Sequence, residues 1–324
     1  MTLSGRVLIT GGSGFIGRAL YLAAREGDWP VQWTALSRDD HKHARLAQRF
    51  PEVQFVAGDI RMDTERLASL MRGHDIVIHA AASKHVDLAE LAAWETVDVN
   101  VFGSRNVAQA AITARVPQVL GISTDKACGP STYGITKAIM ERLFQEADGL
   151  SDTAFTLCRY GNVVGSTGSV VPKFREQIAR GERIHLTDPR MTRFWMGWRE
   201  AVRTIVYGLN TAQRGVIAIP RPRAMTLHDL ALTALGRDEH GPLPPDLVVV
   251  DGVRPGERMH EELVTMEESP RVMDFGRFYQ ILPPGHTDPA AASRPLFRVS
   301  SADAPGGLIG PADMAALIAE SEGI

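Results

Sequence analysis

Residues 10–17 read TGGSGFIG, and this stretch decides the fold of the first half of the chain. Three of its four glycines stand at positions 11, 14 and 17, directly after the apolar run RVLIT (6–10) and at the start of a helical pattern. Gly11 permits a turn that a Cβ would forbid, and Gly14 lets backbone N–H groups approach a pyrophosphate at the positive end of the helix. Gly17 lets the helix pack closely on the strand. The spacing therefore predicts a dinucleotide-binding turn, with a ligand-free strand–helix turn as the alternative.

Apolar runs continue to alternate with helical patterns as far as residue 160. The predicted strands cover residues 6–10, 31–36, 53–57, 75–81, 118–123 and 155–159. The predicted helices cover residues 14–25, 43–50, 64–71, 95–114 and 133–147. Continuous apolar strands joined by helices are typical of a parallel sheet covered on both faces. The sequence thus predicts the α/β class, with a Rossmann-type doubly wound parallel sheet.

Beyond Asn162 the pattern changes, because glycine, serine and proline mark loops around residues 165–168, at Pro172 and at Pro189. The elements predicted there are shorter: helices at 198–210, 227–235 and 311–320, and strands at 215–219 and 247–251. We expect residues 1–160 to form the cofactor-binding domain. Residues 161–324 are expected to form a smaller, mainly substrate-binding α/β part, and the chain can cross between the two more than once.

The composition excludes several classes of protein. The 324 residues carry a net charge of −3, so nothing indicates a nucleic-acid or membrane footprint. No run of 18 apolar residues occurs, which argues against a membrane span. Two cysteines, Cys128 and Cys158, without a CxxC spacing are too few for a disulfide framework, and no histidine cluster has metal-ligand spacing. We expect a cytoplasmic protein without a metal.

The end of the second predicted strand discriminates between the two nicotinamide cofactors. An acidic residue there would accept a hydrogen bond from the ribose 2′-OH of NAD. This strand instead ends in Ser37 and Arg38, and arginine pairs bidentately with a phosphate such as the 2′-phosphate of NADP. NADP is therefore favoured, although Asp39 and Asp40 follow and leave NAD possible. Asp59, after the third strand, is expected either to accept from the adenine amino group or to cap its own turn.

Tyr133 and Lys137 form a Tyr-x-x-x-Lys pair at the start of a predicted helix. Residues four apart share one helix face, and an ammonium beside a phenol lowers the pKa of the phenol toward the working pH. The pair follows the fifth predicted strand, where a parallel sheet presents its ligand crevice. This placement favours a proton-transferring pair over an ordinary amphipathic helix edge.

The fifth strand is followed by Thr124, Asp125 and Lys126. Taken alone, this triplet is typical of a helix N-cap followed by surface charges. Together with the glycine turn and the Tyr-x-x-x-Lys pair, however, it resembles the extended short-chain dehydrogenase/reductase superfamily. More narrowly, the chain resembles the inverting UDP-N-acetylglucosamine 4,6-dehydratases and their relatives in capsular polysaccharide biosynthesis. The resemblance spans residues 6–269 and rests on the stretches TGGSGFIG, HAAASKHVDLAE, STDKA, YGITKAIMERLF, RYGNVVGSTGSVVPKF, LTDPRMTRFWM and GVRPGERMHEEL.

The resemblance implies a lyase whose steps run at C4, C5 and C6 of a UDP-sugar. Tyr133 would be the base for oxidation at C4, Lys137 would tune it and hold the nicotinamide ribose, and Thr124 would bind the sugar. Lys126 would remove the C5 proton while Asp125 protonates the departing C6 hydroxyl, and hydride would then return to C6. Lys126 can act as a base only if its pKa is depressed. Lysine in place of the glutamate of the retaining hexose dehydratases indicates the inverting branch.

The resemblance also implies two sets of contact residues. NADP would be contacted by Gly11, Ser13, Gly14, Phe15, Ile16, Gly17, Ser37, Arg38, Asp59, Ile60, Ala80, Ala81, Ala82, Tyr133 and Lys137. The nucleotide sugar would be contacted by Lys84, Asn162, Val171, Pro172, Phe174, Thr187, Arg193, Arg254 and Glu257. Glu261 is interpreted as a helix-cap partner.

Three features of the interpretation stay open at this point. The loop between Lys126 and Tyr133 is shorter than in the family pattern and contains Cys128 and Gly129, so the inverting outcome depends on its geometry. An NDP-sugar 4- or 5-epimerase on the same scaffold is the alternative activity, and a non-catalytic NADP-binding regulator is a remote one. The family further implies a homo-oligomer, with the helices around 95–114 and 133–147 in contact.

Overall fold

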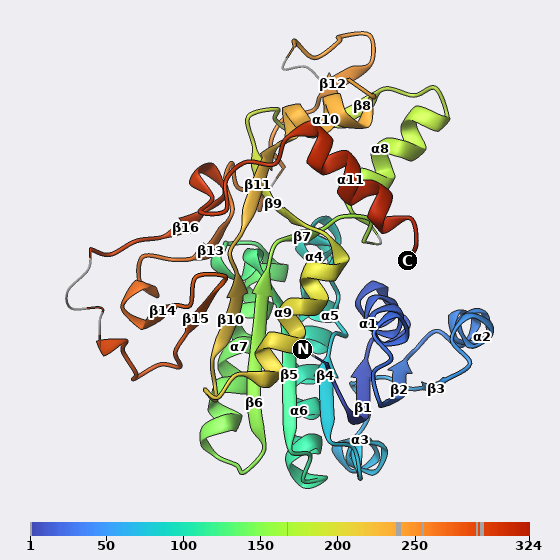
Figure 1. Ribbon diagram of the computed structural model, residues 1–324, viewed down its shortest axis with the longest axis vertical. Helices are drawn as coiled ribbons and strands as arrows, with labels where there is room; N and C mark the ends of the chain where they lie inside the picture. Colours follow the sequence, from blue (N-terminus) through green and yellow to red (C-terminus); the bar gives the residue numbers. More distant parts are fainter. Residues whose placement is uncertain (1, 167, 238–240, 255, 290, 292–294) are drawn as a thin grey trace.

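A nine-stranded sheet runs through the protein and carries its ligand-binding edge (Figure 1). The computed structural model describes residues 2–166, 168–237, 241–254, 256–289, 291 and 295–324. The strands of the large sheet are β1 (Gly5–Thr10), β2 (Val31–Ser37), β3 (Val53–Ala57), β4 (Ile76–His79), β5 (Gln118–Thr124), β6 (Ala154–Tyr160), β10 (Ile217–Pro220), β14 (Val272–Asp274) and β15 (Phe278–Ile281). Their spatial order is β3-β2-β1-β4-β5-β6-β10-β15-β14.

The pairing of the strands confirms the predicted fold class. Every pair from β3 to β10 is parallel, and the order of the first six strands, 3-2-1-4-5-6, is that of the doubly wound dinucleotide-binding fold. Only β15 runs antiparallel, between β10 and β14. The order reverses between β1 and β4, and such a reversal opens a crevice at the carboxyl ends of the strands.

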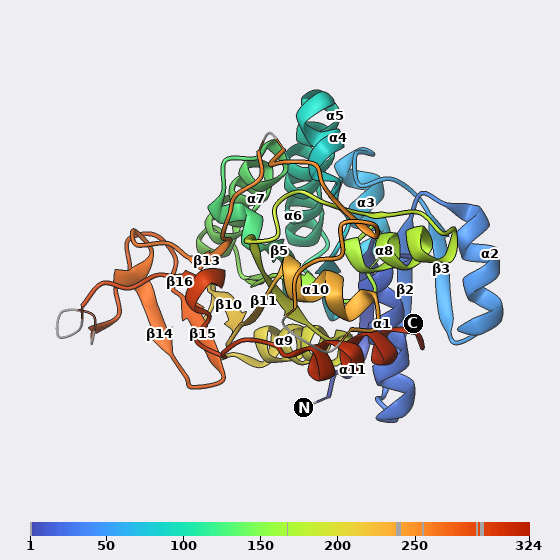
Figure 2. The same ribbon diagram turned by 90° about the horizontal axis from the view of Figure 1, so that it is seen from above.

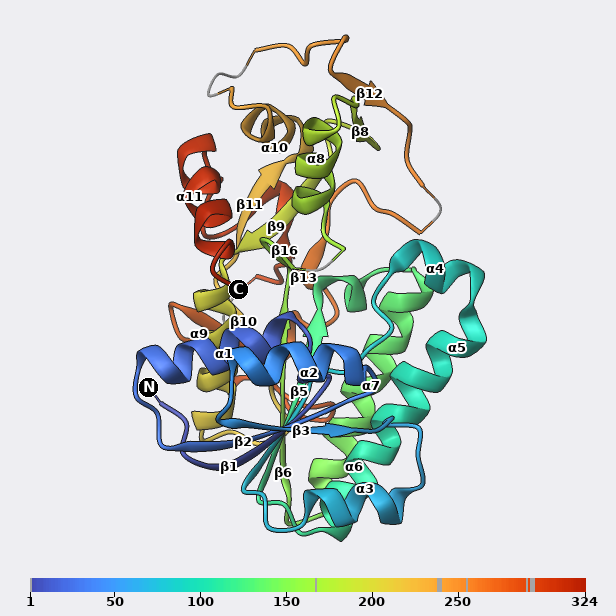
Figure 3. The same ribbon diagram turned by 90° about the vertical axis from the view of Figure 1, so that its right-hand side faces the viewer.

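Helices cover both faces of this sheet, as Figure 3 shows from the side. α1 (Phe15–Glu26) packs against α9 (Trp198–Asn210) on one face. The other face carries α3 (Thr64–Met71), α6 (Gly103–Thr113) and α7 (Thr132–Gly149). Alternate residues of β1 enter the two resulting cores, Val7 and Ile9 on the α1 side and Leu8 on the α6 side. Within the described part of the chain, no helix is both long and apolar enough to cross a bilayer.

The single helix predicted for residues 95–114 is wrong in detail, because the helical run changes its pitch. It consists of α5 (Ala93–Val97), a π-helical turn (98–102) and α6, and α4 (Val86–Leu91) precedes it. The π turn presents Asn100, whose side chain bonds the backbone of Ser83 and the hydroxyl of Thr136 on α7. Single π turns are frequent at functional sites, and this one ties the loop after β4 to the helix that carries Tyr133.

The second part of the chain lies at the carboxyl ends of the strands, and Figure 2 shows it from above. It contains β7 (Asn162–Val163), β8 (Ile184–Leu186), β9 (Thr192–Met196), β11 (Arg223–Thr226), β12 (Val248–Val250), α8 (Val170–Ala179), α10 (Leu227–Ala234) and α11 (Pro311–Ser321). The loop prediction at Pro172 is wrong, because this proline lies in the first turn of α8, where the N–H group it lacks would have no helical partner.

Residues beyond 160 also return to the large sheet. They supply α9 to one of its faces and β10, β14 and β15 to its edge. A short antiparallel pair, β13 (Glu262–Val264) and β16 (Val299–Ser300), lies between the two parts. The chain therefore passes from one part to the other more than once, while the assignment of cofactor and substrate to residues 1–160 and 161–324 stays a prediction.

Candidate active site

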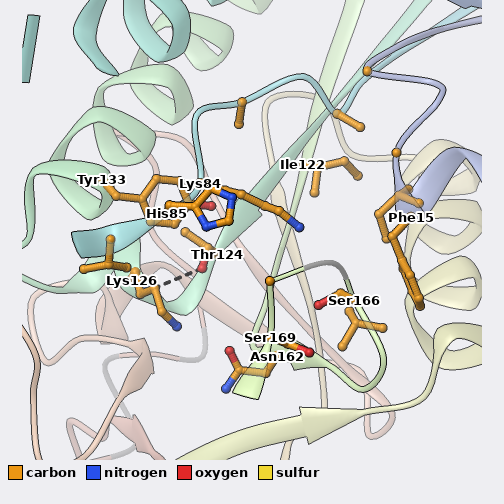
Figure 4. A pocket seen from close by; sticks show the side chains of 18 of the residues that line it. Phe15, Lys84, His85, Ile122, Thr124, Lys126, Tyr133, Asn162, Ser166 and Ser169 are labelled. Carbon is orange, nitrogen blue, oxygen red and sulfur yellow. Dashed lines mark hydrogen bonds between the residues drawn. The ribbon is translucent and has the colours of Figure 1, made fainter. Parts of the chain in front are cut away.

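A pocket of about 880 Å³ opens where the second part of the chain faces the carboxyl ends of β1 to β5. Its wall combines the glycine turn, the loops after β2, β3 and β4, the start of α7, residues of α8 and β9, and Arg254 and Glu257. Figure 4 shows Tyr133, Thr124 and Lys126 on one side of this pocket and Phe15, from the glycine turn, on the opposite side. The pocket therefore joins residues of the three sequence motifs that carried the functional interpretation, the glycine turn, the Thr-Asp-Lys triplet and the Tyr-x-x-x-Lys pair.

The glycine turn is too tight for other residues. Gly11 has a φ of +71°, and a Cβ built there would lie 2.9 Å from the backbone of Ala81. A Cβ at Gly17 would lie 2.0 Å from the carbonyl oxygen of Gly12. Gly14 is the N-cap of α1 and forms no side-chain cap, so the first N–H groups of the helix face the pocket. This cradle fits a pyrophosphate.

The predicted cofactor residues line this pocket with one exception. Gly17 is not in the wall and instead packs against Gly12 beneath the turn. Ser37 donates a hydrogen bond to Ser13 Oγ at 2.8 Å and contacts His43 Nε2 at 2.5 Å. Its hydroxyl is thus held between the glycine turn and α2 (Asp40–Arg49).

Arg38 and Asp59 lie next to each other in the pocket wall. Arg38 is largely exposed and lies 3.8 Å from the Asp59 carboxylate and 3.9 Å from that of Glu95. Asp59 Oδ1 also accepts a hydrogen bond from the backbone N–H of Arg61 at 2.9 Å. This is the bond expected if Asp59 caps its own turn. Arg38 is only loosely paired, so its guanidinium can turn toward a phosphate.

Several basic side chains surround the glycine turn. Lys84, after β4, and Lys42, on α2, both line the pocket. Burial lowers the pKa of Lys84, and the positive charges of Arg18 and Lys42 lower it further. Arg18 donates from Nη1 to the carbonyl of Ser13, but its buried Nε has no partner among the described residues. This surplus of positive charge suits a ligand with several phosphate oxygens.

The Thr124–Lys126 segment forms a partly buried turn at the end of β5. β5 ends at Thr124, whose hydroxyl caps a 3₁₀ turn (Asp125–Cys128) by accepting from Lys126 N. Asp125 is fully buried, and its Oδ1 accepts from Thr124 Oγ1 at 2.9 Å and from Lys126 Nζ at 3.0 Å. Its Oδ2 has no partner among the described residues. The expectation of surface charges, which the triplet alone favoured, is wrong.

Tyr133 and Lys137 project from the first turns of α7 into the same pocket. The N-cap of this helix is Ser131, which accepts from Gly134 N at 3.1 Å. Burial raises the pKa of Tyr133 to about 12, while Lys126 and a hydrogen bond with Thr124 oppose this rise. Burial lowers the pKa of Lys137 to about 8. In this arrangement Lys126 is a cation that favours the phenolate of Tyr133, and the tuning role of Lys137 stays a prediction.

Lys126 itself stands between two carboxylates. Asp125 lies 3.0 Å and Glu261 3.9 Å from its Nζ, and Arg193 Nε lies 3.7 Å from the same Glu261 oxygen. Burial favours the neutral amine, but the two carboxylates outweigh it and raise the pKa of Lys126. The depressed pKa that a resting lysine base requires is therefore not present. Glu261 precedes a β-strand, so its interpretation as a helix cap is also wrong.

Most of the predicted substrate residues reach the pocket, and two do not. Val171 and Pro172 lie on the first turn of α8, outside the wall, whereas Phe174 of the same helix is in it. Arg254 forms an ion pair with Asp87 at 3.0 Å. The substrate residues in the wall are Lys84, Asn162, Phe174, Thr187, Arg193, Arg254 and Glu257.

Sequence reasoning missed other members of the wall. They include Lys42, His85, Ser166, Ser169, Lys173 and His185. His85 and Lys173 lie inside motifs that the resemblance already used, so their position next to predicted site residues was a usable signal. His185 had no such signal. In the described ranges, no group of three or more His, Cys, Asp or Glu side chains is arranged to hold a metal ion.

With this geometry defined, the relationship to known sequences becomes informative. Residues 7–283 match the family described as polysaccharide biosynthesis protein. The chain is 37% identical to an inverting UDP-N-acetylglucosamine 4,6-dehydratase from Campylobacter jejuni, over 86% of this chain and 82% of the relative. It is also 34% identical to a UDP-glucose 4-epimerase from Rickettsia canadensis, over 85% and 82% of the two chains.

Two solved structures share the fold. One is the X-ray structure of Pen from Bacillus thuringiensis, 30% identical, with a TM-score of 0.86 over 99% of this chain and 98% of that one. The other is a dTDP-glucose 4,6-dehydratase double mutant from Streptomyces venezuelae with NAD and DAU bound. It is 26% identical, with a TM-score of 0.69 over 78% of this chain and 86% of that one.

Proposed function

The chain belongs to the polysaccharide biosynthesis protein family, within the extended short-chain dehydrogenases/reductases, and from this premise we propose that it is an inverting UDP-N-acetylglucosamine 4,6-dehydratase. One observation carries the proposal. Thr124, Lys126 and Tyr133 share a pocket with the glycine turn, and the buried Asp125 lies directly behind this wall, 3.0 Å from Lys126 Nζ, so two proton-transferring groups face one ligand site and a third contacts one of them.

A nicotinamide dinucleotide is the cofactor class, and we infer NADP as the form used. The bound cofactor would accept the hydride from C4 of the sugar and return it to C6. The glycine turn would hold its pyrophosphate, and Ser37, Arg38 and Lys42 would face its 2′-phosphate. NAD bound to the Streptomyces venezuelae dehydratase supports the class and leaves the phosphate preference to be measured.

The chain's own residues would move three protons. Tyr133 takes the proton of the C4 hydroxyl, assisted by the charge of Lys126 and the hydrogen bond with Thr124. At rest Lys126 is an ammonium beside Asp125, so a proton first passes from Nζ to Oδ1 across 3.0 Å. This transfer creates a neutral amine and a carboxylic acid in one step. Lys126 then removes the C5 proton, and Asp125 gives its proton to the C6 oxygen as water leaves.

Elimination leaves Lys126 as an ammonium and Asp125 as a carboxylate. When hydride returns to C6, a solvent-derived proton would add at C5 on the face opposite the one from which Lys126 removed it, and Tyr133 would release the proton of the C4 hydroxyl to solvent, which restores the resting charges. The second candidate, a sugar-nucleotide 4-epimerase, is favoured by the similarity to the Rickettsia canadensis protein. An epimerase needs only the C4 step, so it gives no role to a lysine–aspartate pair beside Tyr133. The pair therefore favours the dehydratase.

Incubation of the purified protein with UDP-N-acetylglucosamine and NADP tests the proposal by mass spectrometry and NMR. A product lighter by one water molecule, with inverted configuration at C5, is the expected result. A product of unchanged mass identifies the epimerase instead. In D2O the dehydratase product carries deuterium at C5, and Lys126→Ala is expected to abolish this incorporation.

We further propose that the protein is a cytoplasmic homo-oligomer. Phe102, at the end of the π turn, and Ile135 and Ile139, on α7, are apolar and between 41% and 49% exposed. These segments are the ones that the family resemblance places in contact between copies. Analytical ultracentrifugation of the wild type and of Ile139→Lys tests this surface, and a monomeric wild type contradicts it.

A further inference from the structure

Lys126 borders two cavities, and the two carboxylates beside it, those of Asp125 and Glu261, are placed differently with respect to these cavities. Besides the large pocket, a second cavity of about 50 Å³ is lined by Lys126, Arg193, Glu257, Arg258 and Glu261, among others. Lys126 lines both cavities, whereas Glu261 lines only the small one and Asp125 lines neither. Glu261 can therefore act on Lys126 without contacting a ligand in the large pocket.

The surroundings of Glu261 make its charge effective. The side chain is buried, so its field is only weakly screened by water. Its Oε1 lies 3.9 Å from Lys126 Nζ, a separation that a bridging water could span in a cavity of this size. Burial and the nearby Asp125 raise the pKa of Glu261, and the positive charges of Lys126, Arg193 and Arg258 offset only part of this rise.

We propose that Glu261 is a positioning residue that holds Lys126 as an ammonium ion in the resting site and so sets the pH at which Lys126 becomes a base. The proposal rests on the proposed function only for the role of Lys126 as the C5 base. The charged and titratable groups around Lys126 are Asp125 on its own turn, Glu261 before β13, Arg193 on β9 and Tyr133 on α7. Asp125 must also serve as an acid, whereas Glu261, which pairs with Arg193 as well, lies outside the wall of the large pocket.

The proposal explains how a lysine between carboxylates can work as a base. Glu261 stabilises the ammonium at rest, and Asp125 is the adjacent proton acceptor when a sugar is bound. Two carboxylates near one another also favour a proton on one of them. The negative charge of Glu261 therefore favours the protonated form of Asp125 during the transfer. The same charge also prevents Lys126 from losing its proton to solvent before the sugar is bound.

The test measures the ionisation of Lys126 without turnover. The protein with NADP is treated with acetic anhydride between pH 7 and 12, and acetylation of Lys126 is followed by peptide mass spectrometry. Only the neutral amine reacts, so the midpoint reports its ionisation. For Glu261→Gln we expect a midpoint lower by about one pH unit, a tenfold larger neutral fraction, because an opposite charge at this distance has been removed.

Glu262→Gln is the matched control, because Glu262 is the adjacent residue and pairs with Arg258 and Arg298 instead. Its midpoint is expected to equal that of the wild type. Glu261→Met removes the charge without a buried amide and must give the same downward shift, so the test survives if Glu261→Gln fails to fold. An unchanged or higher midpoint in the folded Glu261 variants overturns the proposal.

Turnover supplies a second reading that separates this proposal from the proposed function. If the wild type dehydrates UDP-N-acetylglucosamine, the acid limb of its kcat/KM profile is expected to move to lower pH in Glu261→Gln. If the wild type shows no dehydration while the acetylation midpoint still shifts, the proposed function fails and the charge-setting role of Glu261 stands. If the wild type dehydrates the sugar while the midpoint and the acid limb both stay in place, the proposed function stands and the role of Glu261 fails.

Discussion

At the scale of single residues, the chemistry depends on ionisation states that neighbouring side chains set. Tyr133 has a pKa of about 12, well above neutral pH, so its role as a base requires that positive charge be brought close to it. Lys126 and the hydrogen bond with Thr124 supply part of this effect. We therefore expect removal of the phenol oxygen to slow the C4 step directly.

Tyr133→Phe is expected to reduce kcat by a factor of about 10²–10⁴, the usual contribution of a general base. The loss is expected without a change of fold, because the ring is retained. Tyr207→Phe is the control, since Tyr207 stacks on Phe278 far along α9 and is absent from the pocket wall. Steady-state kinetics and circular dichroism check the two variants. Equal activities of Tyr133→Phe and the wild type contradict the assignment.

Lys137 is expected to lower the stability of the protein at neutral pH. It is 2% exposed, and its pKa of about 8 means that folding buries an ammonium below that pH. Because the folded pKa is depressed, the unfolded chain binds more protons between pH 8 and 10.5, and stability rises through this window. At pH 7 the buried ammonium of Lys137 lowers the free energy of unfolding by an amount on the order of 3 kcal/mol.

Lys137→Met should therefore be more stable than the wild type at pH 7, by about 1–3 kcal/mol, and should lose activity. The advantage is expected to shrink as the pH rises from 8 to 10.5, where the wild-type lysine becomes neutral in the folded state. Urea unfolding at several pH values measures both effects. An advantage that does not depend on pH would assign the gain to packing instead of charge.

At the scale of elements, a buried ionic cluster fixes the turn that carries Asp125 and Lys126. Arg159, at the end of β6, pairs with Glu141 of α7 at 2.6 Å and with Glu268 at 2.8 Å, and it also donates to the carbonyl of Leu263. Its Nη1 lies 3.2 Å from the sulfur of Cys128, the last residue of the 3₁₀ turn. The cluster therefore joins β6, α7, β13 and the site turn.

Arg159→Leu should destabilise the protein by about 3–5 kcal/mol, because it leaves two buried carboxylates without their partner. Arg25→Leu, which breaks the exposed pair with Glu52, is the control and should cost at most about 1 kcal/mol. Urea unfolding compares them. The triple variant Arg159→Leu, Glu141→Gln, Glu268→Gln is expected to regain part of the lost free energy of unfolding. Equal losses in Arg159→Leu and Arg25→Leu would argue against a stabilising role of the buried cluster.

At the scale of the whole molecule, the pocket is a joint product of the two parts of the chain. The glycine turn and α7 come from the first part of the chain, and Phe174, Arg193 and Arg254 come from the second. A nucleotide sugar that contacts both parts binds only the folded protein. Such a ligand is expected to stabilise the molecule by an amount that grows with its concentration.

UDP at 100 times its Kd should stabilise the wild type by about 2.7 kcal/mol. Arg193→Ala removes a buried guanidinium from the pocket wall, so its Kd should rise at least about tenfold and the gain should fall by about 1.4 kcal/mol. Arg180→Ala, an exposed residue outside the wall, is the control. Thermal unfolding with and without UDP measures the gains. An unchanged gain in Arg193→Ala would place UDP elsewhere.

The sequence by itself determined the layered sheet, the glycine turn and the Tyr-x-x-x-Lys pair, because each is encoded within one strand–turn–helix segment or one helix face. It did not determine the π turn beside Asn100 or the first turn of α8 at Pro172, where helical geometry overrides local composition.

Only the tertiary structure decided what surrounds Lys126. Glu261 and Arg193 reach this side chain from segments that lie 135 and 67 residues further along the chain, and no spacing rule in the sequence relates them. Their effect is electrostatic, and it depends on distances of a few ångströms and on the exclusion of water. Such distances are fixed only when the two parts of the chain pack together. The candidate reactive residues could therefore be predicted from local sequence motifs, whereas their charge states could not.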